Sequence, residues 1–206
     1  MGRLFSRFCE IGGGRGYPIF RLRNSGPGTD IVSRYALRMA EVPISAAITI
    51  HPAASADANG ITSIYLESAD YHAQLDPERY WIPSAEAISA RYREGRQHPP
   101  EAEGNAITLV AKLAGEIVGF VDARLTQSAD PMHREMTYCY IVEIAVSSGH
   151  QSHGIGAQLV HAVEDWGRKQ GAEFASLEYL AANPRAGAFY QRQGYRAGTI
   201  VAIKRL

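Results

Sequence analysis

The stretch HQSHGIGAQL, residues 150–159, places small residues where the surrounding pattern predicts the start of a helix. The preceding segment, residues 136–146, is apolar on both faces, as is typical of a central strand. The following segment repeats apolar residues at helical spacing as far as Gly171, where glycine favours a helix end. The first N–H groups of a helix lack internal partners and favour an anion, which a loop of small residues lets approach. The stretch therefore predicts either a phosphate-binding loop or a tightly packed structural turn.

Two well-known phosphate loops do not fit this stretch. A Walker loop ends in Gly-Lys-Ser/Thr, which is absent here. A dinucleotide-binding fingerprint needs a third small residue where Leu159 stands, and it lies early in its domain, whereas only about 50 residues follow Gly156. If this loop binds a phosphate group, it does so neither as a Walker loop nor as a dinucleotide-binding loop.

Composition and charge narrow the class of protein. The 206 residues are 46% hydrophobic and 20% charged with a formal net charge of zero, as in an ordinary globular protein. The first 40 residues hold seven arginines and two acidic residues, whereas the rest carries 14 basic and 19 acidic side chains. An acidic body argues against nucleic acid as the main partner and favours a cationic one.

Cysteine and histidine usage predicts no metal site and no disulfide. Cys9 and Cys139 lie far apart, and the seven histidines show no metal-ligand spacing. This favours a reducing, cytoplasmic location. No apolar run approaches the ~18 residues needed to span a bilayer, so no membrane partner is expected.

Two regions of different character are predicted. Residues 1–45 are rich in Gly and Arg without hydrophobic periodicity, which predicts a disordered tail, or untranslated sequence if Met39 is the true start. An Arg-rich organelle transit peptide is the alternative. Residues 46–206 are regular and predict one three-layer α/β domain with a mixed sheet. The expected strands are 46–52, 105–113, 116–125, 136–146, 173–181 and 195–206, and the expected helices are 59–75, 84–97, 155–170 and 183–194.

Two motifs resemble those of the GCN5-related N-acetyltransferase (GNAT) superfamily. The first is Gln151-x-x-Gly154-x-Gly156 at the start of a helix after a central strand. The second is Asn183 and Tyr190 around the last helix. Either motif alone is weak, but the two at this separation, in the matching order of elements, form a strong joint signal.

The resemblance covers about residues 46–206 and implies a three-layer α/β/α GNAT-like fold with acetyl-CoA as co-substrate. Two departures are His153, where Lys or Arg is common, and Gly187 inside the last helix. The strand would pair with the pantetheine amides and the loop would hold the pyrophosphate. The cofactor-binding residues that the resemblance implies are Ile144, Ala145, Val146, Gln151, Ser152, His153, Gly154, Ile155, Gly156, Ala157, Asn183 and Tyr190.

Glu143 interrupts an otherwise apolar strand, where an unpaired buried carboxylate would cost several kcal/mol. It is either part of an ion pair or a water-filled notch, or it is a general base that takes a proton from an attacking amine. Tyr190 is either a core aromatic or, by family position, the donor of a proton to the CoA thiolate. Asn183 caps the last helix, holds the cofactor arm, or does both.

The acceptor side is expected around residues 68–81. There His72 is either a surface histidine or a pocket residue, and Asp76, Glu78 and Tyr80 could receive a cationic amine. The function that follows is acetyl transfer from acetyl-CoA to a small-molecule or peptide primary amine in a ternary complex. The alternatives are a non-catalytic acyl-CoA-binding module and an acyltransferase for a longer acyl chain. The oligomeric state is left open, a homodimer included.

Overall fold

The computed structural model describes residues 47–95, 97–98, 104–128 and 132–205. The chain divides into two units, residues 1–44 and 45–206. The tail predicted for residues 1–45 lies outside the described residues, and only the second unit is considered below.

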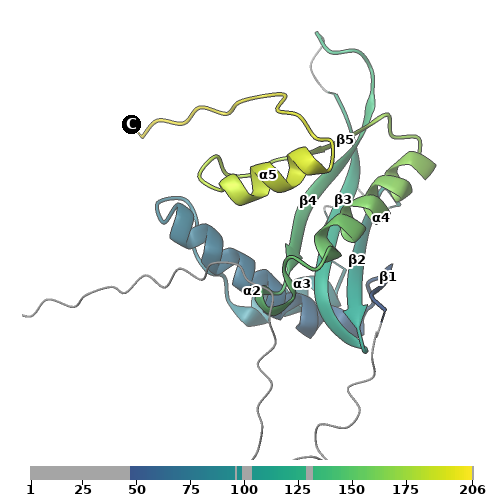
Figure 1. Cartoon of the computed structure of the whole chain (residues 1–206), viewed down its shortest axis with the longest axis vertical. Coiled ribbons are helices and arrows are strands. Elements are labelled where there is room, and N and C mark those ends of the chain that lie inside the picture. Colours follow the sequence, from purple (N-terminus) through teal and green to yellow (C-terminus); the bar gives the residue numbers. More distant parts are fainter. Residues whose placement is uncertain (1–46, 96, 99–103, 129–131, 206) are drawn as a thin grey trace, which may run out of the picture. The chain divides into compact units, whose positions relative to one another are not determined.

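A single five-stranded sheet of order β1-β2-β3-β4-β5 forms the centre of this unit (Figure 1). The strands are β1 Thr49–Pro52, β2 Ala106–Leu113, β3 Glu116–Gln127, β4 Thr137–Val146 and β5 Phe174–Leu177. Neighbours from β1 to β4 are antiparallel, and β4 and β5 are parallel. The sheet is mixed, as the sequence predicts. Ala114 and Gly115, with φ of 50° and 87°, make the tight turn between β2 and β3.

The helices are α2 Ala58–Leu75, α3 Ala85–Arg93, α4 Ile155–Lys169 and α5 Pro184–Arg192, with short 3₁₀ turns η1 Ser55–Asp57 and η3 Ser148–His150. Side chains cap two of them. The Ser84 hydroxyl accepts from the Ala87 amide at 3.2 Å, and the Asn183 carbonyl accepts from the Ala186 amide at 3.1 Å. The expected starts of these helices follow from such local signals.

Helices cover both faces of the sheet, which confirms the three-layer prediction. Alternate residues of each strand point to opposite faces. Leu109 and Val121 pack with α4, whereas Val110 and Phe120 pack with α2 and α3. Within the described part of the chain, no helix is long and apolar enough to cross a membrane.

Helix α4 comes unusually close to β4 at one point. A Cβ placed on Gly167 would lie 2.5 Å from the Cβ of Cys139. Both residues are buried. Glycine at this helix position therefore sets the distance between the helix and the sheet.

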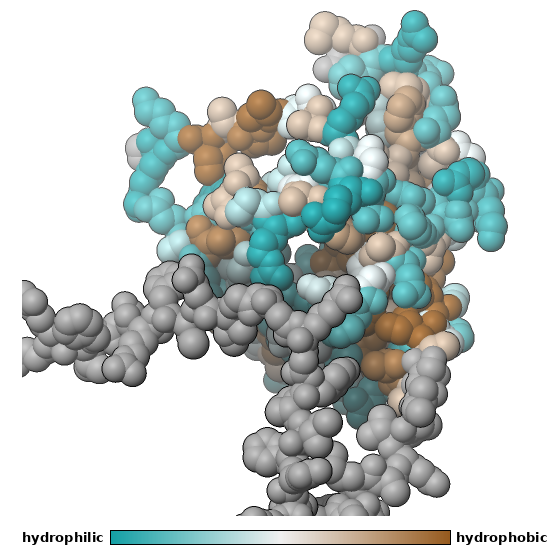
Figure 2. All heavy atoms as spheres, viewed as in Figure 1, coloured by the Kyte–Doolittle hydropathy of each residue, from teal (hydrophilic) through white to brown (hydrophobic). Residues whose placement is uncertain are grey.

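Two element ends and one whole strand differ most from the expectation. The helix expected over 84–97 ends at Arg93, and the strand expected over 173–181 ends at Leu177. The closing strand expected over 195–206 is wrong for its described residues, 195–205, which form no strand. Its β-branched residues favour a strand, but none of the described strand edges pairs with it. Its apolar residues are exposed: Ile200 88%, Val201 72% and Ile203 62%. Figure 2 shows hydrophobic residues, in brown, along the C-terminal segment.

Candidate active site

An open edge of β4 marks the centre of the candidate site. β5 pairs with β4 only from Tyr138 to Ile141. The β3–β4 register then shifts, so that Ile141 lies opposite Ala123 and Glu143 lies opposite Asp122. Beyond this bulge, β4 pairs with β3 alone among the described strands. The three strand residues predicted to hold a cofactor, Ile144, Ala145 and Val146, all lie on this half-paired segment.

The loop of residues 147–154 joins this strand to α4. Ser152 and Gly154 have positive φ, 66° and 78°. Histidine side chains hold the loop, His150 Nδ1 to Ser147 Oγ at 2.8 Å and His153 Nδ1 to the Gln151 carbonyl at 2.8 Å. No side chain of the described residues caps α4, and its first turn carries no acidic residue. The free N–H groups and the helix dipole therefore suit an anion here, as the sequence predicts.

The two glycines of the motif have different roles. A Cβ on Gly154 would meet no atom within 4 Å, but its φ of +78° strains other residues. A Cβ on Gly156 would lie 3.3 Å from Cζ of Phe189, on α5. The small size of residue 156 thus serves the packing of α5 against α4, whereas the sequence interpretation assigned both glycines to the approach of the phosphate.

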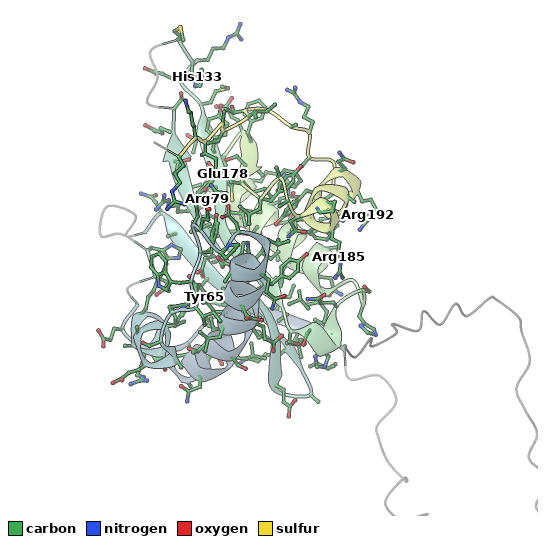
Figure 3. All side chains as sticks on the ribbon, turned by 90° about the vertical axis from the view of Figure 1, so that its left-hand side faces the viewer. Tyr65, Arg79, His133, Glu178, Arg185 and Arg192 are labelled. Atoms are coloured by element: carbon green, nitrogen blue, oxygen red, sulfur yellow. The ribbon has the colours of Figure 1, made fainter. Side chains whose placement is uncertain are left out.

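A cation from α5 reaches the same loop. Arg185 Nη2 lies 3.4 Å from Oε1 of Gln151, whose Nε2 donates to the Val146 carbonyl at 3.3 Å. Figure 3 shows Arg185 on α5 with its side chain pointing outward. The sequence analysis missed this arginine, because the motif around Asn183 gives no sign that it meets the loop. Asn183 caps α5.

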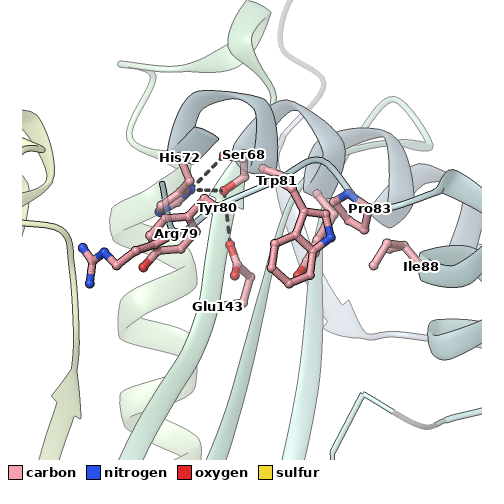
Figure 4. Close-up of a pocket in the computed structure, with 10 residues that line it drawn as sticks. Ser68, His72, Arg79, Tyr80, Trp81, Pro83, Ile88 and Glu143 are labelled. Atoms are coloured by element: carbon pink, nitrogen blue, oxygen red, sulfur yellow. Dashed lines mark hydrogen bonds between the residues drawn. The ribbon is translucent and has the colours of Figure 1, made fainter. Parts of the chain in front are cut away.

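Glu143 accepts a hydrogen bond from a helix on the other side of the open edge. Ser68 Oγ, on α2, donates to Glu143 Oε1 at 3.2 Å (Figure 4). His72 Nδ1 lies 2.8 Å from the Ser68 carbonyl, and since a carbonyl only accepts, this nitrogen carries a proton. Burial raises the pKa of Glu143, and the nearby His72 and the Ser68 hydrogen bond offset part of that rise. No ion pair to Glu143 forms within the described residues, so of the interpretations from sequence the water-filled notch and the general base are left open.

A cavity of about 360 Å³, here named the α2 pocket, opens above Glu143. The residues that line it are Tyr65, Ser68, Ala69, His72, Arg79, Tyr80, Trp81, Pro83, Ile88 and Glu143. Of the acceptor residues suggested by sequence, His72 and Tyr80 line the pocket. Asp76 instead pairs with Arg79 at 2.6 Å, and Glu78 lies 3.4 Å from Arg205, so neither faces the pocket as a free carboxylate.

Tyr190 is buried in α5 at 8% exposure, among the rings of Tyr179, Phe189 and Tyr195. Burial raises its pKa to about 12, and the charge of Glu143 adds to the rise. Its hydroxyl makes no hydrogen bond to any described residue. Tyr190 is thus both a packed aromatic and a protonated group within the electrostatic reach of Glu143.

Asp122 is a second buried carboxylate, which the sequence analysis missed. It is fully buried on β3 directly opposite Glu143, and Tyr92 donates to it at 2.6 Å. Burial raises the pKa of Asp122. The signal was available, because Asp122 interrupts an apolar strand just as Glu143 does. Its negative charge adds to the raised pKa of Glu143.

Cys139 is unsuited to nucleophilic chemistry. Its side chain is buried, its Sγ faces the Val163 carbonyl at 3.6 Å, and burial raises its pKa to about 11. Among the described residues, no group of three His, Cys, Asp or Glu side chains could hold a metal ion.

Comparisons with known proteins bear on the family and the fold. The model of the Acetyltransferase (GNAT) family matches residues 60–195. A mutant of the BH1408 protein from Bacillus halodurans has a similar structure, with 19% identity and a TM-score of 0.69 over 77% of this chain and 99% of that chain. The aminoglycoside N-acetyltransferase AAC(6')-Iy in complex with CoA is also similar, with 19% identity and a TM-score of 0.60 over 81% and 99% of the two chains.

A third similar structure is a transcriptional regulator from Bacillus halodurans C-125, with 21% identity and a TM-score of 0.59 over 78% of this chain and 100% of that chain. None of the curated proteins matches the sequence significantly.

Proposed function

Since the chain belongs to the Acetyltransferase (GNAT) family, we propose that it transfers an acetyl group from acetyl-CoA to a primary amine by direct attack in a ternary complex. The observation that carries this proposal is the position of Glu143. It stands on β4 at the open edge and lines the α2 pocket at the same time. A base at this position can take the proton of an amine in the pocket while the amine attacks a thioester bound along β4.

The donor side would be held mostly by backbone. The unpaired edge of Ile144–Val146 offers N–H and C=O groups to an extended chain of amides, in the manner of an added strand. The uncapped start of α4 suits the pyrophosphate, and Arg185 adds a positive charge to the loop. The residues present fit acetyl-CoA, which supplies the activated acetyl group.

The acceptor side would supply the proton chemistry. Glu143 takes a proton from the amine, whose nitrogen forms a bond to the carbonyl carbon while the carbon–sulfur bond breaks. The raised pKa of Glu143 suits a base that works near neutral pH. Tyr190, protonated at that pH, gives its proton to the leaving thiolate. The high pKa of Cys139 and its burial argue against an acetyl-cysteine step.

The direct test measures binding and transfer separately. Titration calorimetry with acetyl-CoA and with butyryl-CoA reports the binding of each, and release of free CoA thiol with a panel of amines reports transfer. We expect acetyl-CoA to bind and an amine to release thiol. Binding without release on any amine would favour the non-catalytic module, and tighter binding of butyryl-CoA with faster turnover would favour a longer acyl donor.

A further inference from the structure

The α2 pocket combines a single acid at its base with aromatic and aliphatic walls. Glu143 is the only carboxylate among the residues that line it in the described part of the chain. Tyr65, Tyr80 and Trp81 supply rings, and Pro83 and Ile88 supply aliphatic surface. Ser68, His72 and Arg79 also line the cavity, so it is partly polar. One acid beside aromatic and aliphatic walls is suited to one ammonium group carried on an apolar body.

The rim of the pocket is apolar and exposed. Trp81 is 78% exposed, Ile82 52% and Tyr80 37%, in three consecutive residues after α2. Figure 4 shows the Trp81 ring beside the pocket near the side chain of Glu143. Contiguous exposed apolar side chains beside a pocket mark a surface that a ligand covers. A flat ring stacked on Trp81 would bury the exposed face of the indole.

Among the described residues that line the pocket, no second acid is available to a polycation. Arg79 lines the pocket, and its guanidinium lies 5.6 Å from the centre of the Tyr80 ring. The nearest additional acid on that segment, Asp76, is already paired with Arg79 at 2.6 Å. A ligand with several ammonium groups would therefore meet one unpaired carboxylate, Glu143, and at the mouth an Asp76–Arg79 ion pair without net charge.

The size of the pocket agrees with this chemistry. A cavity of about 150 Å³ is enough to hold benzene. The α2 pocket, at about 360 Å³, therefore has room for a ring and a short chain that carries the amine.

From these four observations we propose that the acceptor is an aromatic monoamine, with its amine at Glu143 and its ring against Tyr80 and Trp81. This inference rests on the proposed function and deepens it by naming the substrate class. It sets the chain apart from the similar structures that are named aminoglycoside acetyltransferases, one of which is in complex with sisomicin. The pocket has aromatic walls, and Glu143 is the only acid among its described lining residues.

The test compares three probes on the full-length protein saturated with CoA. 2-Phenylethylamine is the aromatic monoamine, n-hexylamine is an alkyl monoamine of similar length, and sisomicin is the polycation. Calorimetry gives the dissociation constant of each, and thiol release from acetyl-CoA gives kcat/KM. We expect 2-phenylethylamine to bind about two- to tenfold tighter than n-hexylamine, from ring packing, and tighter than sisomicin.

Two variants test whether the rim of the pocket causes the preference for an aromatic amine. Trp81→Ala should remove most of the preference for the ring while the affinity for CoA is unchanged, because Trp81 lies outside the 147–154 loop. Ile200→Ala, which truncates another exposed apolar side chain, one outside the pocket, should leave the preference intact.

The outcomes separate the two proposals. Tightest binding by sisomicin, or an aromatic preference that survives in Trp81→Ala, overturns the inference. Binding in the expected order without thiol release supports the inference about the pocket and contradicts the proposed transfer.

Discussion

The 147–154 loop and the α2 pocket meet the same short stretch of β4, one at Val146 and the other at Glu143, but they are built differently. The loop presents backbone groups set by two positive φ angles and a helix start. The pocket presents side chains from α2, the segment after it and β4. A backbone site depends on conformation and tolerates changes of side chain, whereas a side-chain site can be redirected by a single substitution. Damage to the loop should therefore affect binding of the donor, and damage to the pocket should affect turnover and choice of acceptor.

Glu143→Gln should give the largest difference between an effect on turnover and an effect on donor binding. The amide keeps the shape of the side chain but cannot take the proton from the amine, so turnover should fall by roughly 10²–10⁴-fold. The affinity for acetyl-CoA, measured by calorimetry, should stay near that of the unchanged protein. Unaltered turnover would mean that the amine loses its proton to solvent and that positioning alone carries the reaction.

Gly154→Val should produce the opposite pattern. A β-branched residue at a φ of +78° is strained by about 1–2 kcal/mol. If the loop must hold this conformation to bind the donor, acetyl-CoA should bind about five- to thirtyfold more weakly. Gly149→Val is the matched control, because residue 149 lies in the same loop in open space without a positive φ. Equal affinities of the two variants would contradict the role of the Gly154 conformation in donor binding.

Tyr190→Phe should have a smaller effect. The ring packing remains, and only the hydroxyl is lost, so we expect turnover to fall about three- to tenfold, below the usual range for a general acid, because a CoA thiolate is a stable leaving group. Since burial raises the pKa of Tyr190 to about 12, the hydroxyl stays protonated through neutral pH. If the single-turnover rate of Tyr190→Phe equals that of the unchanged protein, Tyr190 is a packed aromatic residue and not a proton donor.

Ser68→Ala should change the pH dependence more than the rate at its optimum. The Ser68 hydroxyl donates to the charged form of Glu143 and so lowers its pKa. Without that bond the pKa rises, Glu143 stays protonated to higher pH, and the acid limb of the kcat/KM profile moves to higher pH. Ser63→Ala, an exposed serine on the same helix, should leave the limb in place. If the acid limb of the kcat/KM profile does not move in Ser68→Ala, another group is the base.

The same contrast explains what the sequence could predict. The hairpin at Ala114–Gly115, the α4 start and the loop are local, because each depends on residues within one turn or strand end. The pocket depends on contacts between distant residues. In the pocket, Ser68 and Glu143 are 75 positions apart. The loop also has one contact of this kind, because Arg185 and Gln151 are 34 positions apart. No pattern along the chain indicates such a meeting.

Two features differ from the interpretation of the sequence: the buried carboxylate Asp122, which was overlooked, and the closing strand, which does not form. Asp122 carried the same signal as Glu143, a carboxylate inside an apolar strand, and its partner Tyr92 comes from a helix 30 positions earlier. The closing strand expected over 195–206 had the right residue types, but a strand also requires an edge to pair with, which residue types do not supply.

The close approach of α4 to β4 at Gly167 and Cys139 limits the routes by which this chain can diverge. A lineage that places even alanine at position 167 must accept a Cβ 2.5 Å from that of Cys139, so the step is blocked while both elements keep their places. The order of events is then imposed: position 139 must first lose its side chain, or the helix must first move outward. Related chains that keep the present spacing should carry glycine at one of these two positions. The residue types at positions 139 and 167 should therefore change together.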